Sequence, residues 1–83
     1  DALLRDAIVY LTCLHETGNA LGLSHTDQFA DIMYRFQAPD DATRYFARYR
    51  ASLRSMDEIG TAGASGLSPN DLRRLRQLYG GDR

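Results

Sequence analysis

Apolar residues in the first quarter of the chain recur every three or four positions. This spacing places them on one side of a helix, so it predicts an amphipathic helix over residues 1–22. Asp1 is suited to cap its start, and Gly22 to end it. The predicted stripe consists of Leu4, Ala7, Ile8, Leu11, Leu14, Gly18 and Leu21.

A second helical pattern follows over residues 40–59. Asp40 and Asp41 are suited to cap its start, and the arginines fall largely outside its apolar stripe. The aromatic residues interleaved with arginines are compatible with RNA or peptide binding, but a core-facing stripe with a solvated basic flank explains them more simply. The stripe consists of Tyr45, Phe46, Tyr49, Leu53 and Met56.

A third helix is predicted over residues 68–80. Ser68 is a favourable N-cap, Pro69 suits the first helical position, and Asp71 complements the helix dipole in the first turn. Gly80 and Gly81 mark its end. Its predicted apolar face consists of Leu72, Leu75, Leu78 and Tyr79.

The remaining segments lack helical periodicity. Residues 23–39 form a long connection of the kind that often carries function, and residues 60–67 form a glycine-rich loop expected to be flexible. No stretch has a strand pattern. The chain therefore belongs to the mainly α class, with three helices and long loops, as one domain or a domain fragment over residues 1–83.

Composition narrows the range of functions. An apolar share of 43% and a charged share of 25% are typical of a globular protein, and 83 residues suffice for only a small core. The net charge of −1 gives no reason to expect nucleic acid or a membrane surface as a partner. Cys13 stands alone, which excludes an internal disulfide, and its position predicts a small buried residue. The chain has no apparent signal peptide or membrane span, and its abrupt helical start suggests that an upstream part is missing or was removed.

The most informative stretch is residues 15–25, HETGNALGLSH. His15 and Asn19 are four positions apart and share a helix face, and Glu16 projects beside them. Gly22 allows a sharp turn that would bring His25 back toward the helix. Imidazole nitrogen suits zinc, and a carboxylate beside a metal-activated water suits a general base. Two ordinary histidines, one at the edge of the apolar stripe and one capping the helix, are the alternative explanation.

These residues resemble the zinc-peptidase signature H-E-x-x-H-x-x-G-x-x-H of the metzincins, which a downstream methionine turn accompanies. Asn19 stands where that signature has its second histidine. Three further motifs extend the resemblance to the C-terminal half of a matrixin-type catalytic domain. They are DIMY at residues 31–34, LSPNDL at 67–72 and LYG at 78–80.

The resemblance implies a zinc endopeptidase. In it His15, Asn19 and His25 occupy the metal-ligand positions, Glu16 is the general base, and Met33 forms a turn beneath the metal. The implied cofactor is zinc, bound weakly or lost because of Asn19. The implied substrate is a peptide or protein, and the implied location is secreted or extracellular.

Two further departures distinguish the chain from this family. The family usually follows its Met-Tyr with Pro-x-Tyr, whereas this chain has Arg35, Phe36 and Gln37 there. The family's N-terminal sheet is absent, so either a sheet-bearing fragment or self-association would cover the exposed helix face. A rival from another class is a catalytically inactive, metzincin-derived helical module that binds a partner.

Overall fold

The computed structural model describes residues 1–36 and 40–80. Its order of elements is α1 (Ala2–Ala20), α2 (Asp41–Ala51), the 3-10 turns η1 (Met56–Glu58) and η2 (Ala62–Ala64), α3 (Pro69–Leu75), and η3 (Arg76–Gly80), a turn of π-helix. The mainly helical prediction is confirmed: within the described ranges there are no strands, only an isolated parallel bridge between Thr26 and Tyr34. None of the helices in these ranges is long and apolar enough to cross a membrane.

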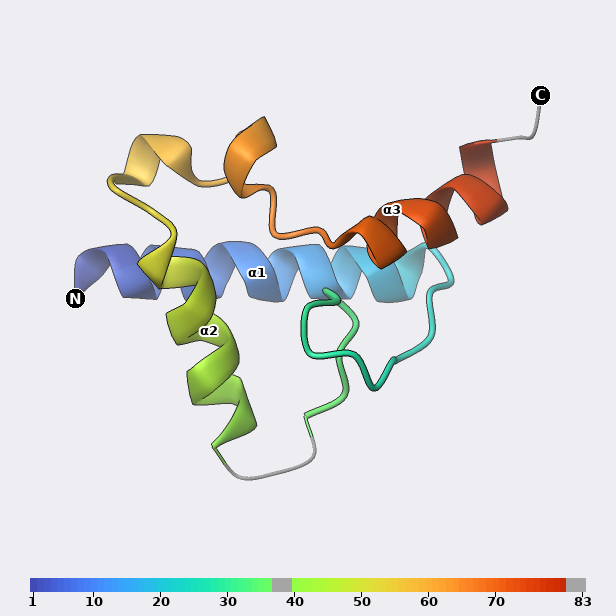
Figure 1. The fold of residues 1–83 in the computed structure, drawn as a ribbon, viewed down its shortest axis with the longest axis horizontal. Coiled ribbons are helices and arrows are strands. Elements are labelled where there is room, and N and C mark those ends of the chain that lie inside the picture. The colour runs from blue at the N-terminus through green and yellow to red at the C-terminus, as the bar shows by residue number, and fades with distance from the viewer. Residues whose placement is uncertain (37–39, 81–83) are drawn as a thin grey trace.

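α1 is the longest element, and the others are arranged along it (Figure 1). α2 lies across its first half, while the loop after Gly22 and α3 lie beside its second half. Asp1 caps α1 by accepting a hydrogen bond from the Leu4 amide at 2.8 Å. Gly22 has a φ of +97°, which favours glycine, so the chain turns where the sequence predicts.

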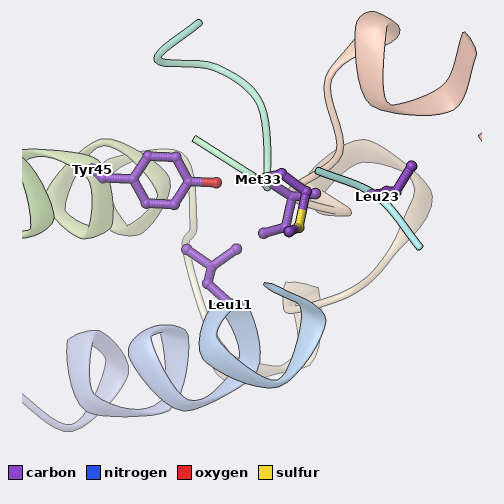
Figure 2. Packing of buried hydrophobic residues seen from close by; sticks show 5 residues of the cluster. Leu11, Leu23, Met33 and Tyr45 are labelled. Carbon is purple, nitrogen blue, oxygen red and sulfur yellow. The ribbon is translucent and has the colours of Figure 1, made fainter. Parts of the chain in front are cut away.

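The core lies where the loop, α1 and α2 meet (Figure 2). Leu11 points up from α1, and the Tyr45 ring extends from α2 toward Met33. Burial of such apolar side chains is the main favourable contribution to folding. The buried cluster consists of Leu11, Leu23, Ile32, Met33 and Tyr45.

α2 is shorter than the helix predicted over residues 40–59. The backbone amides of Ser52 and Leu53 bond to carbonyls three positions back, a tightening that ends the helix at Ala51 and turns Leu53 inward. Met56 therefore leaves the predicted stripe and is 51% exposed.

The predicted apolar face of α3 is also wrong in part. Asp71 is fully buried, so the inward side of the helix is the one that carries Ser68, Asp71 and Leu75. Leu72, Leu78 and Tyr79 lie beside this face and are exposed. The α-helix itself ends at Leu75, and the predicted stop at Gly81 lies outside the described residues.

One smaller prediction, the burial of Cys13, also changes. Cys13 is exposed rather than buried, because it lies two positions beyond Leu11 and so on another side of α1. The loop over residues 60–67, predicted to be flexible, contains η2 and accepts hydrogen bonds from Tyr10 at Ser65 and from Tyr49 at Ala64. These two bonds attach the loop to α1 and α2.

Candidate functional site

His15 lies one turn beyond Leu11 on α1 and is half-buried. Its Nδ1 is 2.8 Å from the carbonyl oxygen of Ile32. A carbonyl oxygen only accepts hydrogen bonds, so Nδ1 carries the proton and Nε2 keeps its lone pair when the ring is neutral. A histidine that ligates a metal commonly makes this kind of bond through its other nitrogen.

His25 returns to His15 after the turn at Gly22. The centroids of the two rings are 5.4 Å apart, and their planes are inclined by 23°. The sequence predicts that these residues converge, and the structure brings them side by side. Imidazole nitrogens are common zinc ligands, so this pair is the part of the predicted ligand set that the structure brings together.

Glu16 joins the two histidines in the lining of one pocket of about 420 Å³. Glu16 is exposed, so its carboxylate can exchange a proton with water. Aromatic side chains from the loop and α2 line the other side of the pocket. They are Tyr34, Phe36, Tyr45 and Phe46.

Asn19 is exposed one turn beyond His15 and is not part of the pocket lining. The described part of the chain contains no group of three or more His, Cys, Asp or Glu side chains placed to hold a metal. Of the four predicted site residues, the structure thus gathers His15, Glu16 and His25 on one pocket, and Asn19 is outside its lining.

Met33 packs against α1 at Gly18 and is fully buried. A Cβ added at Gly18 would come within 2.7 Å of the Met33 sulfur. The missing side chain at Gly18 therefore lets the segment that carries Met33 pack closely against α1. This close approach also places the Ile32 carbonyl within reach of His15.

A buried carboxylate, Asp31, joins this segment to the start of α3. Its Oδ1 accepts from the Ser68 hydroxyl at 2.6 Å, and its Oδ2 accepts from Asn70 and Thr26, each at 2.8 Å. Burial disfavours the charge of Asp31, but these donors outweigh it and lower the pKa of the carboxyl.

A second carboxylate, Asp71, lies against the first. Its Oδ2 accepts from the backbone amides of Ile32 and Ser68, each at 2.8 Å. Burial is the main influence here, and it raises the pKa of Asp71. Sequence reasoning identified Ser68 and Asp71 as helix-start residues but missed both long-range roles, since a capping pattern indicates a local contact only.

Comparison with known proteins found no match: no protein-family model, no curated protein and no solved structure resembles the chain at a significant level.

Proposed function

We propose that the chain is a matrixin-like, zinc-dependent metalloendopeptidase segment whose activity is weakened by Asn19. The observation that carries this proposal is the gathering of His15, Glu16 and His25 on one pocket, with His15 Nδ1 committed to the Ile32 carbonyl. The order of these residues along the chain also matches the metzincin signature.

The donor set fits zinc through two imidazoles. His15 and His25 would hold the ion, and the neutral amide oxygen of Asn19 would be a weaker third ligand than imidazole. When bound, zinc lowers the pKa of a water molecule and polarises a carbonyl group. With two strong protein ligands instead of three, we expect weak retention of the metal.

Glu16 is the group suited to move the proton. In peptide hydrolysis the water oxygen bonds to the carbonyl carbon and the carbon–nitrogen bond breaks. The proton that the water loses passes to the Glu16 carboxylate and then to the leaving amine. The aromatic side of the pocket would hold an apolar substrate side chain next to the bond that is cut, because burying apolar surface is favourable.

Zinc titration followed by calorimetry tests the proposal directly. The chain has only two histidines, so His15→Ala and His25→Ala should each abolish specific binding. Asn19→His should tighten binding by about tenfold or more, an effect at least as large as that of altering an outer-shell partner. Glu16→Gln should leave zinc affinity intact and abolish cleavage of a quenched peptide.

Cys13→Ser is the matched control, because Cys13 is an exposed thiol on the same helix. If Cys13→Ser abolishes zinc binding while His15→Ala leaves it unchanged, the proposed ligands are incorrect. If Asn19→His does not tighten binding, the assumed geometry at the margin of the pocket is incorrect.

The geometry also favours a second function, a non-catalytic module that binds an apolar peptide segment. Four aromatic residues line the pocket irrespective of any metal, and Asn19 stands outside the lining. Binding of an aromatic peptide that is unaffected by chelator and by His25→Ala would support this alternative. Stoichiometric zinc in the purified protein would support the peptidase.

A further inference from the structure

The start of α3 reaches the candidate site through a single residue of the loop. Asp71 Oδ2 accepts a hydrogen bond from the Ile32 amide, and the carbonyl oxygen of Ile32 faces His15 Nδ1. The donor and acceptor are 2.8 Å apart in each case. The first of these bonds joins residues 39 positions apart. Both polar backbone groups of Ile32 are thus engaged, one toward α3 and one toward α1.

This arrangement determines which nitrogen of His15 carries the proton. A neutral imidazole exists in two tautomers, and the partner of one nitrogen decides which is present. If the Ile32 carbonyl moves away, Nδ1 loses its acceptor and the proton is free to reside on Nε2. A protonated Nε2 has no lone pair to offer, so the direction of the Ile32 carbonyl matters for any ligand role of His15.

Asp71 has the features of a residue that fixes such a position. It is fully buried, and its bond to Ile32 lies inside the core, where competing water is excluded. Its Oδ1 is buried with no hydrogen-bond partner among residues 1–36 and 40–80. A helix cap alone does not require this costly burial, because an exposed Asp caps a helix equally well.

We infer that Asp71 is a positioning residue for the candidate site: by holding the Ile32 backbone, it keeps His15 in the Nδ1–H tautomer with Nε2 free for a ligand. The benefit of this positioning, a free Nε2 for a metal, rests on the proposed function. The positioning itself is a property of the protein alone and can be measured without metal.

Nitrogen-15 NMR of the two histidine rings in the zinc-free protein reports the tautomers directly. The spectra are recorded at high pH, where imidazole is neutral. In the unsubstituted protein His15 should be mainly Nδ1–H. In Asp71→Ala the ratio of Nδ1–H to Nε2–H should fall by about three- to tenfold, the factor that corresponds to the net strength of one hydrogen bond.

Two further variants separate positioning from simple support of the fold. Asp71→Asn keeps a carbonyl oxygen for the Ile32 amide, so it should restore most of the Nδ1–H population. Ser68→Ala removes the hydroxyl that accepts from the Asp71 amide at 2.9 Å and donates to Asp31 at 2.6 Å, but it keeps the acceptor that Asp71 offers to Ile32. It should lower stability and leave the His15 tautomer unchanged. If Asp71→Ala unfolds, trimethylamine N-oxide, which favours compact states, is added to all samples.

The inference is overturned if Asp71→Ala keeps the original tautomer ratio, or if Ser68→Ala shifts the ratio as far as Asp71→Ala does. The second result would show that the packing of the start of α3 as a whole, rather than the bond from Asp71 to Ile32, determines the tautomer. Failure of zinc to bind any variant would contradict the proposed function and leave the tautomer result standing. Zinc binding combined with an unchanged ratio in Asp71→Ala would overturn this inference alone.

Discussion

The two halves of α1 are covered in chemically different ways. Against the second half, buried carboxylates hold the segments together: Asp31 and Asp71 collect donors from residues that lie close by and from others almost 40 positions away. Against the first half, tyrosine rings and hydroxyls do so, beside an exposed ion pair between Asp1 and Arg50. Tyr10 stacks with Tyr49 at 5.9 Å, and both donate to carbonyls of the loop that precedes α3.

The difference matters because a buried carboxylate network and a set of tyrosine contacts respond to different perturbations. A carboxylate with several donors loses its function if the acceptor is removed, and each donor left unpaired in the interior is costly. A tyrosine that bonds to a backbone carbonyl contributes mainly its ring area, with one hydrogen bond in addition. The half that carries the candidate site is therefore expected to be the more sensitive to single polar substitutions.

The largest expected effect is that of Asp31→Ala. This change leaves the hydroxyl of Ser68 and the donors of Thr26 and Asn70 without their acceptor, so the free energy of unfolding should fall by about 3 kcal/mol. Urea titration measures it. The exposed Asp57→Ala should stay within about 0.5 kcal/mol of the unsubstituted protein. Equal effects of the two changes would show that the buried network contributes little.

In the other half, Gly66→Ala should have the largest effect. Gly66 has a φ of +84°, and an added Cβ would come within 2.8 Å of a Leu11 methyl carbon. Strain and overpacking together should lower the free energy of unfolding by about 2 kcal/mol. Gly63→Ala is the matched control in the same loop, since a Cβ there meets nothing within 4 Å. If both changes prove neutral, the loop does not pack on α1 as described.

The sequence predicts these two halves unequally. Hydrophobic spacing predicts α1 and places Leu11 and Gly18 on its buried face, and Gly22 predicts the turn that returns His25 to His15. These features depend on local conformation, which a short stretch of sequence determines. Sequence reasoning did not reveal that Asp31 and Asp71 are buried, because each bonds to residues distant in the chain, and a lone Asp is usually exposed.

The end of α2 and the exposed face of α3 are missed because apolar spacing does not reveal hydrogen bonding. The apolar stripe continues past Ala51 to Met56, but the turn at Ser52 follows from hydrogen bonding rather than from apolar spacing. On α3, the inward position is occupied by a carboxylate, which a hydrophobic pattern assigns to the solvent side.

Removing one tyrosine hydroxyl should have a smaller effect. Tyr49→Phe keeps the stacked ring and loses the hydrogen bond to the Ala64 carbonyl, together with a longer, exposed one from the Gly60 amide at 3.3 Å, so the free energy of unfolding should fall by about 1 kcal/mol. Tyr79→Phe is the control. Its hydroxyl bonds to the Leu21 carbonyl, but the residue is 62% exposed, so water can replace the lost partner at little cost. A loss for Tyr49→Phe as large as that for Asp31→Ala would remove the contrast between the halves.

The smallest expected effect is the pH dependence of stability, to which Asp71 and Asp31 contribute with opposite sign. The raised pKa of folded Asp71 means that it takes up a proton before unfolded Asp71 does, so stability should rise as the pH falls from that pKa toward the ordinary value of 3.8. The lowered pKa of folded Asp31 has the opposite consequence. Below 3.8 the unfolded state takes up the proton first, and stability should fall until folded Asp31 is protonated too.

The two contributions act in adjoining pH ranges, so they should leave a shallow maximum in stability on the acid side of neutrality. Urea titrations at a series of pH values, each variant compared with the unsubstituted protein, isolate each carboxylate from the exposed ones. Asp71→Asn should remove the rise, and Asp31→Asn should remove the fall. Each slope is limited to about 1.4 kcal/mol per pH unit, since one group exchanges at most one proton.

A Tyr49→Phe profile should run parallel to that of the unsubstituted protein, because the contact that it removes carries no charge in this range. If Tyr49→Phe changes the slope as much as Asp31→Asn does, the acid response belongs to the whole molecule rather than to the half that carries the histidines.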